Sequence, residues 1–309
     1  MTGVARAGAV MGDHAPSPAP PWRAWLLAAR IPTLTAAVTP VVVGTAAARP
    51  GGGHVLQAVA ALAVAVCIQV GTNFSNDAFD YLRGADTPDR RGPARATQGG
   101  LLSARQVLRG AYLCFALAAL AGTYFVVLYG WPVLVAGLLA IASGLAYTGG
   151  PWPIAYHGLG EVFVFAFFGV MAVAGSAYVQ VGRLTPLAVA ASVPVGLLAT
   201  AILILNNLRD IETDGAAGKR TLPVRIGAPA TRGLYLVCLL GAGAAPAVLH
   251  GAGLVGRGFW LPWLALPPMF ALARAALRSR DAPALNRALA QTARLHLVFG
   301  SLLAASFLW

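Results

Sequence analysis

Residues 186–214 read PLAVAASVPVGLLATAILILNNLRDIETD, and this stretch decides the fold class. Its first part, Pro186–Leu205, carries no charge and matches the roughly 20 apolar residues that a helix needs to cross a bilayer. Amides and carboxylates follow directly. The stretch therefore indicates a membrane-spanning helix that ends in a polar cluster.

The rest of the chain has the same character. Hydrophobic residues make up 58% of its 309 residues, the mean hydropathy is +0.71, and charged residues are 10% against roughly 25% in a soluble domain. Eight more apolar stretches alternate with short polar loops: Thr33–Ala48, Val55–Gly71, Val107–Tyr129, Pro132–Thr148, Glu161–Val181, Leu234–Leu249, Phe259–Leu277 and His296–Leu308. We predict an all-α, polytopic membrane protein of nine transmembrane helices over residues 22–309, behind a flexible tail at residues 1–21.

The basic residues are divided unequally between the two sides of this topology. With the N-terminus inside, 19 of the 22 Lys and Arg residues fall on one side, and only Arg49, Arg183 and Arg257 fall on the other. This asymmetry is the positive-inside rule, so we expect an inner-membrane protein with a cytoplasmic N-terminus and an external C-terminus. The rule also accounts for the net charge of +12 without a nucleic-acid partner.

Seven of the ten acidic residues lie in two short windows, each at the cytoplasmic end of an apolar stretch. In the first window, two amides and two carboxylates share a helix face of about 100°: Asn73, Asn76, Asp77 and Asp80. Gly84 is a natural helix stop that lets the chain turn Asp86 back toward them. The second window repeats the arrangement with Asn206, Asn207, Asp210 and Asp214, and Gly215 is expected to end its helix.

Clustered carboxylates repel one another unless a positive charge lies among them. Oxygen ligands without His or Cys suit Mg²⁺, which proteins usually hold through a few carboxylates together with substrate phosphates. Four basic residues beside the windows are candidates for the remaining phosphate charge: Arg83, Arg209, Lys219 and Arg220. Two such clusters at one membrane face predict a diphosphate carried by an apolar molecule, whereas either cluster alone is also compatible with a solvated helix end.

Three stretches resemble the UbiA superfamily of intramembrane prenyltransferases, and its menaquinone branch in particular. They are residues 73–100 (NFSNDAFDYLRGADTPDRRGPARATQGG), 147–161 (YTGGPWPIAYHGLGE) and 206–227 (NNLRDIETDGAAGKRTLPVRIG). The resemblance implies a helical bundle around a central cavity that opens laterally to lipid. It also implies that the protein transfers a polyprenyl chain from polyprenyl diphosphate to 1,4-dihydroxy-2-naphthoate, with release of diphosphate and CO₂, to give demethylmenaquinone.

The resemblance also implies roles for individual residues. Those of the metal site are Asp77, Asp80, Asp86, Asp210 and Asp214, and catalytic roles fall to Asp77, Asp80, Lys219 and Arg220. Substrate binding falls to Asn73, Asn76, Arg83, Tyr147, Asn206, Asn207 and Arg209. The chain departs from the family pattern in two places, because Gly84 replaces the last Asp of the shorter first motif and the loop after the fourth helix has no basic residue.

Three interpretations compete with this one. A UbiA-type enzyme could use another aromatic acceptor, such as 4-hydroxybenzoate or a chlorin. An ion-coupled transporter would also carry acidic residues in the membrane, but here they lie at one face and no inverted repeat is evident. A lipid phosphotransferase of the CDP-alcohol type would use Asp clusters and Mg²⁺, but its single long motif is absent. In the 147–161 loop, Tyr147 and His157 could contact the acceptor ring, and Glu161 fits either a helix cap or a catalytic role.

Overall fold

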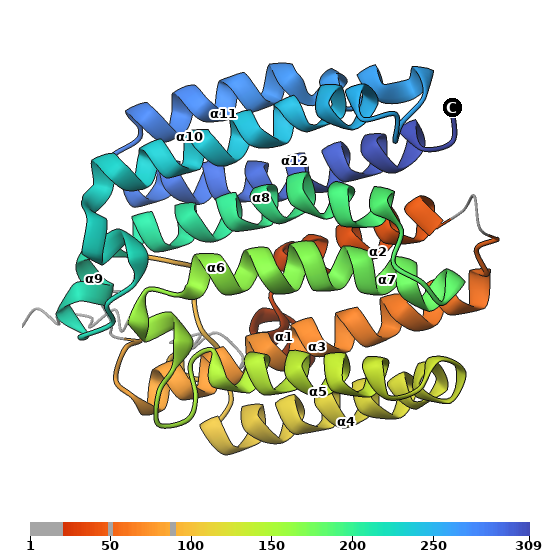
Figure 1. Ribbon diagram of the computed structural model, residues 1–309. Helices are drawn as coiled ribbons and strands as arrows, with labels where there is room; N and C mark the ends of the chain where they lie inside the picture. The colour runs from red at the N-terminus through yellow and green to blue at the C-terminus, as the bar shows by residue number, and fades with distance from the viewer. Residues whose placement is uncertain (1–20, 49–51, 87–90) are drawn as a thin grey trace, which may run out of the picture.

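A computed structural model describes residues 21–48, 52–86 and 91–309 (Figure 1). The predicted tail up to residue 20, and Arg49 and Arg90 of the charge count, lie outside these ranges. Within them, all regular structure is helical and no strand occurs, which confirms the predicted all-α class.

The first half of the chain contributes α1 (Pro21–Ala29), η1 (Ile31–Leu34), α2 (Thr35–Ala48), α3 (Val55–Leu82), α4 (Ala104–Tyr129), α5 (Trp131–Ala146) and η3 (Ile154–His157). The next segments form one continuous helical rod: α6 (Gly160–Val164), the π-helical η4 (Phe165–Met171) and α7 (Ala172–Val181). The remaining elements are α8 (Pro186–Arg209), α9 (Ile211–Ala216), α10 (Leu222–Gly251), η5 (Arg257–Ala265), α11 (Leu266–Arg278) and α12 (Ala282–Ser306).

Eight helices of the described chain are long and apolar enough to cross a membrane, and α5 is a shorter apolar helix. All nine predicted stretches fall on these helices. The continuation of α3 to Leu82 agrees with the helix face predicted for the first window. Two other predicted starts were wrong, because α10 begins at Leu222, with a break at Gly227 where the backbone is not helical, and α12 begins at Ala282. The prediction marked where hydrophobicity stops, but a helix satisfies its own backbone hydrogen bonds and continues into water with polar side chains.

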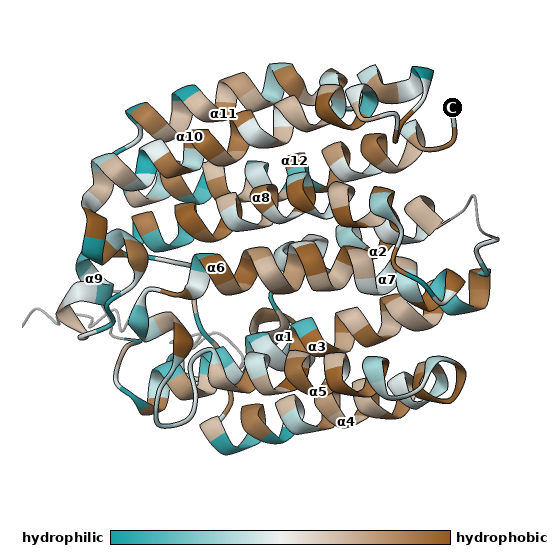
Figure 2. Cartoon of the chain, in the orientation of Figure 1, coloured by the Kyte–Doolittle hydropathy of each residue, from teal (hydrophilic) through white to brown (hydrophobic). Residues whose placement is uncertain are grey.

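The long helices pack side by side, with α3 along α4, α8 along α10, and α2 beside α7 and α12 (Figure 1). The central helix α8 buries Leu198, Ile204 and Leu205 completely. Peripheral helices present large apolar side chains outward, and Val127 is 85% exposed. Figure 2 shows this hydrophobic character along the middle of the long helices. An outer surface of this kind suits lipid.

Both acidic windows lie at the same end of the bundle, beside α9, and the C-terminus lies at the opposite end (Figure 1). Two glycines with left-handed backbone angles turn the chain there: Gly84 (φ +71°) follows α3, and Gly218 (φ +73°) follows α9. Other residues rarely adopt these angles. The predicted stop at Gly84 is confirmed. Gly215, by contrast, lies inside α9, so Gly218 and not Gly215 makes the second turn.

Candidate active site

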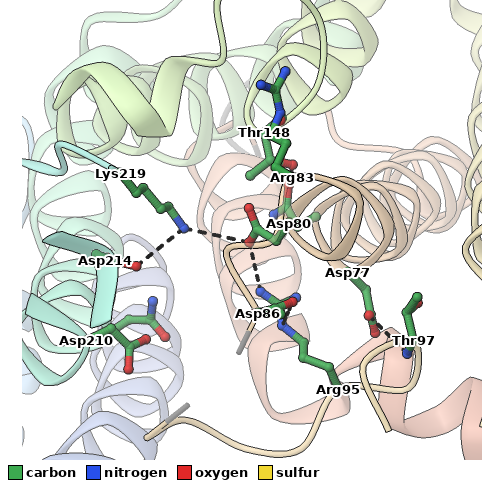
Figure 3. Close-up of polar contacts among 12 residues, drawn as sticks. Asp77, Asp80, Arg83, Asp86, Arg95, Thr97, Thr148, Asp210, Asp214 and Lys219 are labelled. Atoms are coloured by element: carbon green, nitrogen blue, oxygen red, sulfur yellow. Dashed lines mark hydrogen bonds and ion pairs between the residues drawn. The ribbon is translucent and has the colours of Figure 1, made fainter. Parts of the chain in front are cut away.

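The two acidic windows meet across a lysine (Figure 3). Lys219 Nζ lies 3.6 Å from Asp80 Oδ2 on α3 and 3.8 Å from Asp214 Oδ1 on α9. Asp80 is 2% exposed. The fold thus brings together one carboxylate from each window around a shared positive charge, as the sequence predicted for the pair of motifs.

Arg95 supplies a second cation, one that was not among the predicted site residues. Its Nη2 donates to Asp80 Oδ2 at 3.0 Å, and its Nε lies 3.2 Å from Asp86 Oδ2. The turn at Gly84 therefore does direct Asp86 back to the cluster. Arg95 is 5% exposed, and its Nη1 has no hydrogen-bond partner in the described chain. A buried guanidinium with an unused donor offers a contact for an anion.

Tyr156 is a further residue that sequence analysis missed. Its hydroxyl donates to Asp80 Oδ1 at 3.0 Å, and its ring has Arg83 Cζ at 5.5 Å and Lys219 Nζ at 5.4 Å from the centroid. Burial, and then the negative charge of Asp80, raise the pKa of Tyr156. The hydroxyl therefore stays protonated and fixes one oxygen of Asp80, which leaves Oδ2 to the cations. Nothing in the sequence of the 147–161 stretch indicated that Tyr156 would contact Asp80.

Asp77 does not join the cluster, although it lies on the same helix only three residues before Asp80. It is fully buried, and its two carboxylate oxygens accept the backbone N–H groups of Ala96 at 3.1 Å and Thr97 at 3.2 Å (Figure 3). This places Asp77 away from the predicted metal site and in contact with the loop that carries Arg95. We assign it the role of anchoring that loop.

Asp77→Asn tests this assignment. An amide has one acceptor oxygen, so one of the two buried N–H groups would face an NH₂ donor, and an unsatisfied buried group costs about 1–3 kcal/mol. We expect a lower unfolding temperature in detergent and a loosened Arg95 loop. An unchanged unfolding temperature together with a weaker Mg²⁺ dependence of activity would contradict the anchoring role and support Asp77 as a metal ligand.

The other predicted residues of the first window face the neighbouring loops. Asn73 donates to Ala29 O at 2.8 Å, and Asn76 accepts from Thr148 Oγ1 at 2.9 Å. Arg83 donates to the carbonyl oxygens of Thr148 and Gly150. These contacts tie α3 to α1 and to the loop after α5, so the structure does not bring Asn73 or Arg83 to the Lys219 cation.

The second window divides between two partners. Arg209, which is 2% exposed, pairs with Asp210 and also donates to Asn206 Oδ1 at 2.9 Å and Asn286 Oδ1 at 2.7 Å. Its charge is thus engaged by side chains of α8 and α12. Asn207 points elsewhere, and its Nδ2 donates to Glu161 Oε1 at 2.9 Å.

Three more predicted or considered residues lie around this centre. Tyr147 follows α5, and burial, then the charges of Glu161, Asp80 and Asp214, raise its pKa. His157 stacks on Trp152 with ring centroids 4.1 Å apart, and its Nδ1 is 2.9 Å from Pro153 O. Arg220 is exposed, and the structure does not bring its side chain to the cluster.

The carboxylates fit a shared cation better than a closed metal cage. Nowhere in residues 21–48, 52–86 or 91–309 do three Asp, Glu, His or Cys side chains converge to hold an ion by themselves. Asp80 and Asp214 nevertheless both face one positive charge, and their oxygens are hard ligands. Mg²⁺ is commonly bound through one or two carboxylates and substrate phosphates, with water completing the shell. The donor set fits that kind of site.

Comparison with known proteins gives a consistent result. A sequence model of the UbiA prenyltransferase family matches residues 37–300. A 1,4-dihydroxy-2-naphthoate octaprenyltransferase of Mycobacterium tuberculosis is 41% identical over 255 residues, covering 76% of this chain and 87% of that protein. The protein of the same name in Escherichia coli is 36% identical over 279 residues, covering 88% of this chain and 91% of that protein.

Two solved structures share the fold. A UbiA homologue from Aeropyrum pernix K1 in the apo state has a TM-score of 0.69 at 15% identity, covering 87% of this chain and 96% of that one. A UbiA homologue from Archaeoglobus fulgidus bound to GPP and Mg²⁺ has a TM-score of 0.64 at 16% identity, covering 91% and 99%.

Proposed function

This chain belongs to the UbiA prenyltransferase family, and we propose that it transfers a polyprenyl chain from polyprenyl diphosphate to 1,4-dihydroxy-2-naphthoate in a Mg²⁺-dependent reaction. The curated relatives that carry this activity in their names cover most of the chain. The observation that carries the proposal is the meeting of Asp80 and Asp214, 134 positions apart in sequence, around the Lys219 ammonium at one end of a membrane bundle.

Asp80 and Asp214 would hold Mg²⁺ against the diphosphate, with Asp86 and Asp210 beside them. When bound, the ion would stabilise the negative charge that develops on the departing diphosphate. Lys219 and the unused Nη1 of Arg95 are placed to bind diphosphate oxygens. Tyr156 holds Asp80 in a fixed orientation through its 3.0 Å hydrogen bond. These residues bind and orient the leaving group before reaction, which is how positioning lowers a barrier.

Diphosphate departure leaves an allylic cation at the prenyl chain, and the electron-rich naphthoate ring attacks it. We propose that the ring carboxylate then leaves as CO₂, which gives the demethylmenaquinone skeleton. The apolar helices around the polar end exclude the water that would otherwise capture the cation. The prenyl chain itself would lie against apolar helix surface, since hydrophobic residues predominate along the middle of the long helices (Figure 2).

We also propose that the α9 end of the bundle is cytoplasmic and that the C-terminus is outside. The 19-to-3 distribution of basic residues supports this orientation. Single cysteines at Gly215 and Trp309, introduced into a variant without Cys67, Cys114 and Cys238, should react with a membrane-impermeant reagent from opposite sides. Labelling of both positions from the same side of sealed vesicles would contradict the orientation.

Product analysis with a panel of acceptors tests the function. Purified protein is given one prenyl diphosphate, Mg²⁺ and, in separate reactions, 1,4-dihydroxy-2-naphthoate, 4-hydroxybenzoate or a chlorin. We expect a prenylated product from the naphthoate alone. Prenylation of either of the other acceptors in its place would support a UbiA-type enzyme of different specificity. Ion flux without any prenylated product would support the transporter interpretation.

A further inference from the structure

Glu161 is a buried carboxylate that the diphosphate site does not use. It lies at the start of α6, is 5% exposed, and its Oε1 accepts from Asn207 Nδ2 at 2.9 Å. Its Oε2 is fully buried and has no hydrogen-bond partner in the described chain. An unsatisfied carboxylate oxygen is costly in such a setting, so Oε2 is available to accept from a donor group of a bound molecule.

The surroundings of Glu161 connect it to the reaction site. Asn207, its partner, lies on α8 three residues before Asp210. Tyr147 packs against the preceding residue, since a Cβ added at Gly160 would lie 2.9 Å from the Tyr147 hydroxyl oxygen. Tyr147 also lies within the electrostatic influence of Asp80 and Asp214. Asn207 and Tyr147 therefore connect Glu161 to the end of α8 that leads to Asp210 and to the loop after α5.

Helix capping accounts for one contact of the carboxylate, which accepts its own backbone N–H in the first turn of α6, but not for its contact with Asn207. A capping side chain accepts the free N–H groups of the first turn, and the residue at the N-cap position here, Leu159, makes no side-chain cap. Beyond its own backbone amide, the Glu161 carboxylate is bonded to an amide on a different helix. Asn207 thus holds one oxygen and directs the other, which is the arrangement of a positioned base.

We propose that Glu161 Oε2 is the proton acceptor for a hydroxyl of the aromatic acceptor, an inference that rests on the function proposed above. The C–O bond to diphosphate breaks and its electron pair leaves on diphosphate, and a ring carbon then forms a bond to the allylic cation. The conjugated ring hydroxyl gives its proton to Glu161 and becomes a ketone. Loss of the carboxylate as CO₂ returns its electron pair to the ring, and Glu161 returns the proton to the ketone oxygen. The product is the quinol, and the sequence needs neither an oxidant nor a net proton.

Glu161→Gln keeps the hydrogen-bonding shape but removes the base, and Glu212→Gln is the matched control. Glu212 is the only other glutamate in the chain, and it is exposed and paired with Arg91 at the surface. We expect Glu161→Gln to lower kcat for the naphthoate about 100-fold or more, the usual contribution of a general base. The KM for the prenyl diphosphate, and the rise in unfolding temperature caused by Mg²⁺ with inorganic diphosphate, should equal those of the wild type. Glu161→Asp should recover part of the rate.

The outcomes distinguish failure of the Glu161 assignment from failure of the proposed function. A wild-type kcat in Glu161→Gln would overturn the assignment while leaving the proposed function intact. Loss of the diphosphate-induced thermal shift together with activity would also overturn it, because Glu161 would then be needed for the site's structure. A wild-type protein that makes no naphthoate product would instead overturn the proposed function, and this inference with it.

Discussion

Asp80→Asn is expected to lower kcat for prenyl transfer by at least ~100-fold, the scale seen when one transition-state charge contact is lost. The Asp80 carboxylate faces Lys219 and Arg95 through Oδ2 and is fixed by Tyr156 through Oδ1. The neutral amide would remove a ligand from the proposed Mg²⁺ site. It would also remove one of the two carboxylates that face the buried Arg95 and the partly buried Lys219, and loss of a partner from a buried ion pair is unfavourable.

Product formation at saturating substrates measures this effect. Asp281→Asn is the matched control, because Asp281 caps α12 by accepting from Ala284 N at an exposed position. That variant should retain wild-type kcat, since Asn is as good an N-cap as Asp. An Asp80→Asn enzyme that works as fast as the Asp281→Asn enzyme would exclude Asp80 from the reaction site.

Lys219→Met should reduce kcat/KM for the prenyl diphosphate about 10- to 100-fold, with little change in the KM for the naphthoate. A charge-assisted hydrogen bond to a buried phosphate is worth roughly 1.5–3 kcal/mol, and Lys219 Nζ lies between the two carboxylates that face the site. As one of 19 basic residues on the side that we propose to be cytoplasmic, it should hardly affect membrane insertion. Steady-state kinetics with each substrate varied in turn separates these effects.

Arg220 offers the neighbouring comparison. The family resemblance implied the same role for Lys219 and Arg220, but the structure leaves Arg220 exposed. Arg220→Met should therefore keep kcat/KM close to that of the wild type. Equal losses in the two variants would show that both cations reach the diphosphate. Wild-type kinetics in both variants would show that Lys219 does not bind the diphosphate and acts only as one of the positive charges that set the topology.

The fold was predictable from the sequence because membrane helices follow from the length of apolar stretches alone. The meeting of the two acidic windows was also predictable, since each window lies at the end of a helix and both ends lie at the same face of the bundle. Helix ends were less predictable. The starts of α10 and α12 have no hydrophobic signal, and Arg225 and Arg287 lie within these elements.

The contacts within the site were the part that the sequence could not specify. A helical wheel places Asp77 and Asp80 about 60° apart, but it does not show which loop packs against each of the two side chains. The loop after residue 90 folds back on α3, so Asp77 binds its backbone and Arg95 enters the cluster. Arg83 lies close to the cluster in sequence, yet the carbonyls of the loop after α5 take its donors.

Metal dependence of prenyl transfer by the purified protein tests the central claim most directly. The assay contains 1,4-dihydroxy-2-naphthoate and a polyprenyl diphosphate, with either Mg²⁺ or EDTA, and product is quantified after each treatment. If Asp80 and Asp214 form one diphosphate site with Mg²⁺, the prenylated product should appear with Mg²⁺, disappear with EDTA and return when excess Mg²⁺ is restored. Full product formation in EDTA would contradict the joining of the two acidic windows into one metal-dependent site.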